Sequence, residues 1–209
     1  MYGFTKTDIY NNALLELGQP AISGDIDDNN DASTMNILYP RVKDRELMAN
    51  RWQFAIRRIS LAKDTDAPAF GYTSQFSFPQ DLLHPLMYTE PTLYNKWFAI
   101  TSGSELPYAI ENNKVLINSD GPLELVYITR NIKEHEFPPL FIDVLVFSLA
   151  MSLCATMTDS LHKKDFLVKQ YQYSLSIARN RNAVIRSLEQ IADGPLMYAR
   201  KEMKSYVSY

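Results

Sequence analysis

The stretch NRWQFAIRRISLA, Asn50 to Ala62, separates two kinds of sequence and decides the fold. It begins with Trp52 and Phe54, as a core segment does, and then carries Arg57 and Arg58 through an apolar run. The residues alternate with period two, which predicts a strand that starts at Trp52 and has the two arginines on opposite faces. A DNA-reading helix would need more arginines clustered on one face. The stretch is therefore predicted to lead the chain from a helical region into a sheet.

A first helix is predicted from Thr5 to Leu17, where Ile9, Ala13 and Leu17 repeat at four-residue spacing. Thr5 is a suitable N-cap, Asp8 favours the first turn, and Gly18 is a stop signal.

A second helix is predicted over about residues 32–50, with a kink at Pro40. The intervening SGDIDDNNDAS places Asp at alternate positions, as a calcium loop does. The Gly and Glu that an EF-hand loop requires are replaced by Asn30 and Asn36, so a solvated loop is expected.

Residues 69–130 are predicted to form a small antiparallel β region of about five or six strands, because short apolar runs alternate there with Pro, Gly and Asn signals. Tyr72 to Phe78 alternate as an amphipathic strand. Asp120-Gly121 between KVLIN and LELVYIT predicts a hairpin that joins these two runs.

Helical sequence returns at Pro138. The apolar run from Leu140 to Met157 is nearly long enough to cross a bilayer, but Asp143 interrupts it and no aromatic and basic belt flanks it, so a buried helix is predicted. A last helix is expected over about residues 160–190, where the apolar residues form a loose stripe: Phe166, Tyr173, Ile177, Val184, Ile185 and Leu188. Gly194-Pro195 ends it.

The composition is that of an ordinary globular chain of 209 residues, with 46% hydrophobic and 22% charged residues and a net charge of -3. The single cysteine, Cys154, lies in an apolar run and is predicted to be a small core residue. The first ten residues do not have the pattern of a signal peptide. Charge is uneven, since residues 1–31 have one Lys and six Asp or Glu, while residues 161–209 have nine Lys or Arg and four Asp or Glu. This asymmetry favours docking within one chain or head-to-tail association of copies.

No nucleotide, zinc-protease or serine-hydrolase motif is present in the sequence. The three histidines, His84, His135 and His162, have no metal-ligand spacing. Glu134, His135 and Glu136 are consecutive and are expected to form a solvated linker. We therefore predict no catalytic, metal-binding or cofactor-binding residues, no cofactor and no enzymatic activity. Two other functions stay open: a carboxylate-dependent hydrolase, and a nucleic-acid-binding regulator that uses the basic C-terminal helix.

These patterns predict an α+β fold, in which a four-helix bundle from the N- and C-terminal halves contains an inserted antiparallel β region. Residues 1–51 and 138–193 would form the helical bundle domain, residues 52–137 the β domain, and residues 194–209 a C-terminal arm. The arm is rich in large apolar and aromatic residues, which are typical of interfaces. Its predicted partner-binding residues are Leu196, Met197, Tyr198, Tyr206 and Tyr209.

Four motifs follow one another in a recognisable order. They are Leu17-Gly18 with Pro20, Trp52-Gln53-Phe54-Ala55, the segment from Gly71-Tyr72 to Pro79-Gln80-Asp81, and FPPLFIDVLVFSLAMSLC at 137–154. In this order they resemble the tail tubular protein A family, the head-to-tail adaptors of short-tailed bacteriophages, over roughly residues 5–195.

The resemblance implies a structural virion protein, made in the host cytoplasm, that forms a ring, usually of twelve copies, between the portal protein and the tail nozzle protein. Genomic DNA would pass through the lumen without sequence-specific binding, and no membrane would be involved. The family also implies a helical bundle with a β domain, a C-terminal segment that reaches toward the portal, and a joint between the two domains at Trp52 and Phe54.

Overall fold

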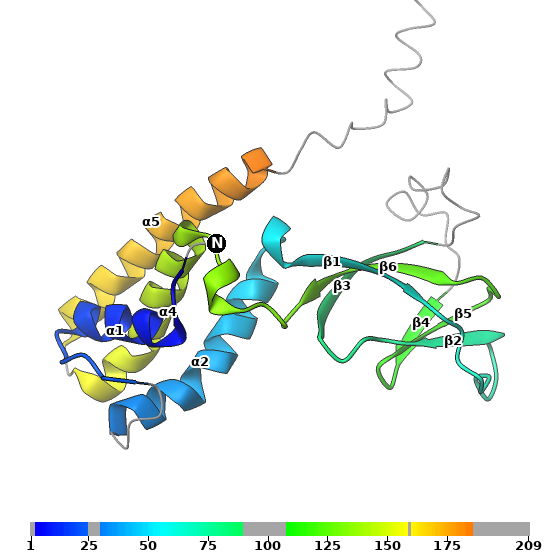
Figure 1. The fold of residues 1–209 in the computed structure, drawn as a ribbon, viewed down its shortest axis with the longest axis horizontal. Helices are drawn as coiled ribbons and strands as arrows, with labels where there is room; N and C mark the ends of the chain where they lie inside the picture. The colour runs from blue at the N-terminus through cyan, green and yellow to red at the C-terminus, as the bar shows by residue number, and fades with distance from the viewer. Residues whose placement is uncertain (1–2, 25–29, 90–107, 159, 186–209) are drawn as a thin grey trace, which may run out of the picture.

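The computed structural model describes residues 3–24, 30–89, 108–158 and 160–185. These residues form a mixed helix and sheet structure, in which the helices gather at one end and the strands at the other (Figure 1). The helices are α1 (Lys6–Leu17), α2 (Asn30–Ala49), α4 (Pro139–Met157) and α5 (Leu161–Ile185). The strands are β1 (Ile56–Leu61), β2 (Ser74–Ser77), β3 (Leu82–Thr89), β4 (Tyr108–Glu111), β5 (Lys114–Ile117) and β6 (Leu123–Thr129). The α+β prediction is confirmed.

The ends of α1 follow the sequence signals closely. The Thr5 side chain accepts a hydrogen bond from the backbone N–H of Asp8, and the Asp8 carboxylate accepts one from the Thr5 backbone, which completes a capping box. At the other end Gly18 has φ 75°, a left-handed conformation that glycine adopts without steric cost. The predicted N-cap and stop signal are both confirmed.

Helix α4 lies in the middle of the helical region, where α1, α2 and α5 all pack against it. Its side chains at Phe141, Leu145, Leu149 and Leu153 are almost fully buried, and Cys154 is buried among them as predicted. The predicted buried helix is therefore confirmed. In the part of the chain that the structure describes, no helix is long and apolar enough to cross a membrane.

The stretch from Asn50 to Ala62 differs from its prediction in its first residues. Gln53–Ala55 form a short 3-10 helix, and β1 begins only at Ile56. The strand prediction for Trp52 and Phe54 is wrong because Trp52 turns inward to the helical core and is almost fully buried there. The prediction that the chain passes from helix to sheet at this point is confirmed.

The six strands form two antiparallel sheets rather than one. The first has the order β1-β6-β3 and the second the order β2-β5-β4. Pro85 lies in β3, an edge strand, where a missing backbone N–H is tolerated, and the pairing of β3 with β6 shifts register beside it. Leu123 and Leu125 from the first sheet and Phe76 and Val115 from the second belong to one buried apolar cluster.

The hairpin predicted at Asp120-Gly121 does not form. The two runs it was expected to join are β5 and β6, which belong to different sheets. The two-residue hairpin lies instead at Asn112 and Asn113, between β4 and β5, where both residues have positive φ, of 47° and 61°. Positive φ at both central positions is the requirement of a type I′ turn, and asparagine meets it more readily than most residues.

Candidate functional site

The five residues that the sequence predicts for partner binding, Leu196, Met197, Tyr198, Tyr206 and Tyr209, lie outside the described residues, as does the larger part of the acidic loop at 25–29. Two other regions of the molecule are candidates, because one has buried polar side chains and the other has exposed apolar side chains. One is the joint between the helical and β regions, and the other is the outer surface of α5.

Trp52 anchors the joint in the helical core. Its ring centroid lies 5.1 Å from that of Phe141 on α4, and its indole N–H donates to the backbone oxygen of Glu46 at 2.8 Å. Phe54 stacks edge-on against Phe137 and Phe141. The expectation that Trp52 and Phe54 serve the core is confirmed, because both rings contact the apolar cluster that the helices share.

A buried carboxylate connects three helices beside this anchor. Glu46 on α2 is only 1% exposed. Ser148 Oγ on α4 donates to Glu46 Oε1 at 2.6 Å, and Tyr171 OH on α5 donates to Oε2 at 3.0 Å. Arg45 lies 3.3 Å from Oε1 and donates to Ser148 Oγ. Burial, reinforced by the nearby Glu46 carboxylate, raises the pKa of Tyr171 to about 12. We call Glu46, Ser148 and Tyr171 the polar hub.

In the hub, both oxygens of the buried Glu46 carboxylate accept hydrogen bonds. A buried charge is tolerated when hydrogen bonds replace its water shell. The hub therefore acts as a structural link that holds α5 against α2 and α4. Sequence reasoning missed it, because a glutamate in an amphipathic helix gives no sign of whether it faces the core.

The return segment between β6 and α4 is tied to α2. Glu134 accepts a hydrogen bond from Tyr39 at 3.1 Å and lies 3.7 Å from Lys43, whose ammonium also donates to the Ile132 carbonyl at 2.7 Å. Burial, with the adjacent Glu134 charge, raises the pKa of Tyr39. The expectation of a solvated linker at Glu134, His135 and Glu136 is thus wrong for Glu134, because a 3-10 helix at 134–136 turns its carboxylate toward α2.

The two arginines of β1 lie on an exposed edge strand, which limits nonspecific edge pairing. Arg57 donates to the carbonyls of Phe54 and Ile56, and its guanidinium lies 3.7 Å from the Glu136 carboxylate. It therefore links the two chain segments that cross between the helical and β regions. Arg58 is exposed and forms no ion pair with a described carboxylate.

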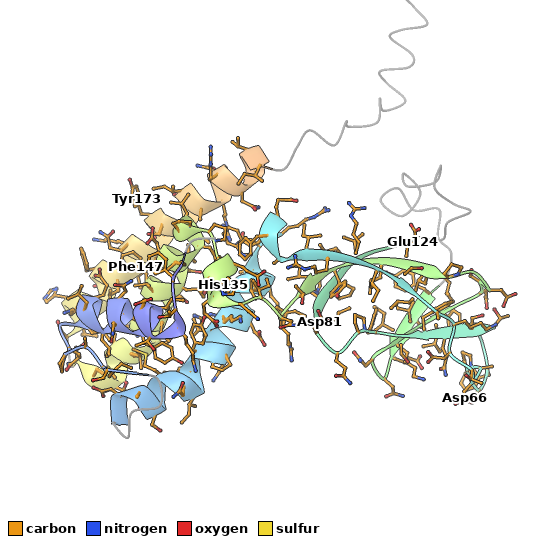
Figure 2. All side chains as sticks on the ribbon, viewed as in Figure 1. Asp66, Asp81, Glu124, His135, Phe147 and Tyr173 are labelled. Atoms are coloured by element: carbon orange, nitrogen blue, oxygen red, sulfur yellow. The ribbon has the colours of Figure 1, made fainter. Side chains whose placement is uncertain are left out.

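The motif Pro79-Gln80-Asp81 has a structural role at the start of β3. The Asp81 carboxylate accepts hydrogen bonds from Thr129 at 2.6 Å and from Tyr127 at 3.2 Å, both on β6. Figure 2 shows Asp81 at the end of the sheet that faces the helices. The motif therefore fixes the register of β3 against β6 near the joint.

The loose apolar stripe predicted for the last helix is mostly exposed: Phe166, Tyr173, Val184 and Ile185 are exposed, Ile177 is partly buried, and Leu188 lies outside the described residues. Phe166 is 50% exposed, Tyr173 65% and Val184 72%, whereas the side of α5 that packs on α4 and α2 has Leu167 and Ala178 as its buried residues. Tyr173 lies on the side of α5 that faces away from α1 and α2 (Figure 2). A stripe of large apolar residues left uncovered on a helix is typical of a protein interface.

Two further features concern metal and ligand sites among the described residues. No group of three His, Cys, Asp or Glu among them is placed to hold a metal ion. A shallow cavity of about 290 Å³ lies beside α1, lined by Gly3, Phe4, Asp8, Asn11 and Asn12. Asp8 is engaged in the helix cap and Asn11 binds the Ile22 backbone through both side-chain atoms, so two of the polar side chains of this cavity already have partners.

No family model matches the chain, and no curated protein matches it.

Proposed function

We propose that this chain is a ring-forming head-to-tail adaptor of a short-tailed bacteriophage, which joins the portal protein to the tail nozzle protein and surrounds the DNA channel. The order of the four sequence motifs carries the proposal. Three of these motifs also have a local role in the fold: Gly18 ends α1, Trp52 anchors the joint, and Asp81 aligns β3 with β6. Proteins that share a fold are expected to share residues at such positions, where a helix ends, a strand begins or two regions meet.

The proposal includes the finer architecture implied by the resemblance. The four helices would form a bundle domain from residues 1–51 and 138–193, and residues 52–137 a β domain inserted into it. About twelve copies would close the ring, and the virion would be its location. The exposed apolar residues of α5 support a chain that works in an assembly, because a ring subunit needs uncovered apolar surface for its neighbours.

The C-terminal arm, residues 194–209, would contact the portal or a neighbouring subunit. This part of the proposal rests on its content of large apolar and aromatic residues, which disordered tails generally lack. Deleting residues 195–209 should leave the melting temperature of the free chain unchanged and prevent its assembly onto portal-containing heads. Normal assembly of the truncated chain would contradict a role for the arm.

The decisive experiment deletes the gene from the phage genome that carries it and examines the particles by electron microscopy. DNA-containing heads without tails are expected, and supplying the chain in trans should restore tailed, infectious particles. Tailed particles in the absence of the chain would exclude the adaptor function. Salt-dependent binding of duplex DNA by the free chain, combined with normal particles, would favour a nucleic-acid-binding regulator.

A further inference from the structure

We propose that the outer surface of α5 is the acceptor site for a second copy of this chain, and that the occupant is the acidic segment 24–31 together with the adjoining ends of α1 and α2. The inference deepens the proposed function, on which it rests for its biological meaning, by naming the two surfaces that would meet around the ring.

The acceptor is a line of apolar side chains on one side of α5. Phe166 and Tyr173 are seven residues apart, about two helical turns, and Tyr173 and Val184 are eleven apart, about three turns. The three side chains therefore project in nearly one direction along the helix. All three are at least half exposed.

Basic side chains border this apolar line. Lys169 lies one turn before Tyr173, and Arg181 lies about one turn before Val184. Neither forms an ion pair with a carboxylate among the residues that the structure describes. Over Leu161–Ile185 the helix has five Lys or Arg and one Asp. An exposed apolar line with basic neighbours calls for a partner that combines exposed apolar side chains with acidic ones.

The N-terminal part of the chain has this character. Leu15 on α1 is 72% exposed and Ile37 on α2 is 74% exposed. Four aspartates lie between them in the sequence, at positions 25, 27, 28 and 31. Carboxylates pair well with arginine and lysine, and partial desolvation in an interface strengthens the attraction.

Within one copy, the start of α2 lies far from the C-terminal end of α5. Residue Asn30 begins α2, and the 20 residues of α2 span about 30 Å. The far end of α2 is fixed to α5, since Arg179 donates to Asn50 and the Asn182 amide donates to the Arg51 carbonyl at 2.8 Å. Arg181 and Val184 therefore lie about a helix length away from the start of α2 in the same copy, so we assign the acidic segment that meets them to another copy.

Charge also argues against the C-terminal residues of the chain as the occupant. Residues 186–209 have four Lys or Arg and three Asp or Glu, so their net charge has the same sign as that of α5. The acidic segment is the stretch of opposite sign. We call the acidic segment and the adjoining helix ends the donor surface, and the outer surface of α5 the acceptor surface. Because these two surfaces differ, the contact is head-to-tail and can close into a ring.

Two charge-reversed variants test the contact by sedimentation velocity at low ionic strength, where the attraction between surface charges is least screened. Lys169→Glu/Arg181→Glu disables the acceptor, and Asp27→Lys/Asp28→Lys disables the donor. The wild-type chain should self-associate with increasing concentration. Each variant alone should associate at least about tenfold more weakly. An equimolar mixture should give a one-to-one complex and nothing larger, because only one functional contact is left.

Two matched controls separate the surface from general effects. Arg58→Glu/Lys133→Glu makes the same charge change at exposed positions outside α5 and should associate as wild type does. Tyr173→Ser should weaken association, whereas Phe70→Ser, at an 88% exposed phenylalanine of the β region, should not. Circular dichroism of every variant should match the wild type.

Several results would overturn the inference: a wild-type chain that stays monomeric at low salt, variants that associate normally, or a mixture that stays monomeric. The inference would also be overturned if association survived the α5 substitutions and was lost on deletion of residues 195–209. Binding of duplex DNA through Lys169 and Arg181, without self-association, would assign the surface to nucleic acid. If gene deletion yields tailless heads while the variants associate normally, the adaptor function stands and this surface assignment fails.

Discussion

The helical and β regions are held together by different means. In the helical region α4 provides a central apolar helix, and the polar hub at Glu46 links α2, α4 and α5 around it. In the β region two three-stranded sheets share a smaller buried cluster around Phe76, and exposed or partly exposed ion pairs, Lys63–Asp120 and Lys114–Asp64, connect its loops and strands. Apolar burial therefore stabilises both regions, whereas the main polar contacts are buried in the helical region and lie near the surface in the β region.

Trp52→Ala should have the largest effect, because Trp52 belongs to the core and also fixes the joint. Truncating a buried aromatic side chain typically costs about 3–5 kcal/mol. The melting temperature and the yield of soluble protein should both fall, and both regions should be affected. Thermal unfolding followed by circular dichroism measures the change. An unchanged melting temperature together with lost partner binding would mean that Trp52 serves an interface instead.

Phe76→Ala should show whether the β region can unfold by itself. Phe76 is fully buried in the β cluster, so the local cost is again about 3–5 kcal/mol. We expect loss of β structure while the helical signal at 222 nm persists. Amide hydrogen exchange would localise the loss to residues 56–129. Joint melting of both regions would show that they form one cooperative unit.

Tyr171→Phe tests the polar hub. It removes the hydroxyl that donates to the buried Glu46 carboxylate and keeps the ring, so a loss of about 1–3 kcal/mol is expected. Urea denaturation measures it. Tyr173→Phe, at an exposed position two residues away, is the matched control and should be neutral. An equally stable Tyr171→Phe chain would show that the hub contributes little.

Asp64→Asn should have the smallest effect on the stability of the fold, and this effect should depend on pH. Partial burial acts to raise the pKa of Asp64, but hydrogen bonds from Lys114 and Ser77 outweigh it and hold the pKa below its ordinary value of 3.8. The ionised form therefore favours the folded chain. This contribution is present above pH 3.8 and is lost as the pH falls through the folded pKa.

At neutral pH the Asn variant should be less stable by under about 1 kcal/mol, the scale of a surface ion pair. The difference between variant and wild type should shrink at the acid end of the range. Denaturation midpoints from pH 7 to pH 2 provide the measurement. A difference that is constant with pH would show that the carboxylate charge is irrelevant to the β region.

Sequence reasoning predicted those features of the fold that depend on local signals. The N-cap at Thr5, the stop at Gly18 and the change of period near Trp52 are local, and the structure confirms them. The hairpin at Asp120-Gly121 was predicted wrongly because a turn signal does not reveal whether the next strand pairs with its neighbour or crosses to another sheet.

The candidate sites were harder to predict for a related reason. Which side of α5 faces the core depends on where α2 and α4 lie, and neither position follows from periodicity. Thus Phe166, Tyr173 and Val184 were expected in a loose apolar stripe and are exposed, while the partners of Glu46 lie about 100 and 125 residues away in sequence. The partner-binding prediction for residues 196–209 stays a prediction.

The central position of α4 also bears on how the chain folds during its synthesis. Helices α1 and α2 leave the ribosome first, but the surface they pack against follows only after the whole of β1 to β6 has been made. The strands pair among themselves and can assemble without waiting for later sequence. We therefore expect the β region to fold before the helical region. The nascent helices α1 and α2 should keep their apolar faces uncovered until α4 has been made, and chaperones can bind these faces in the meantime.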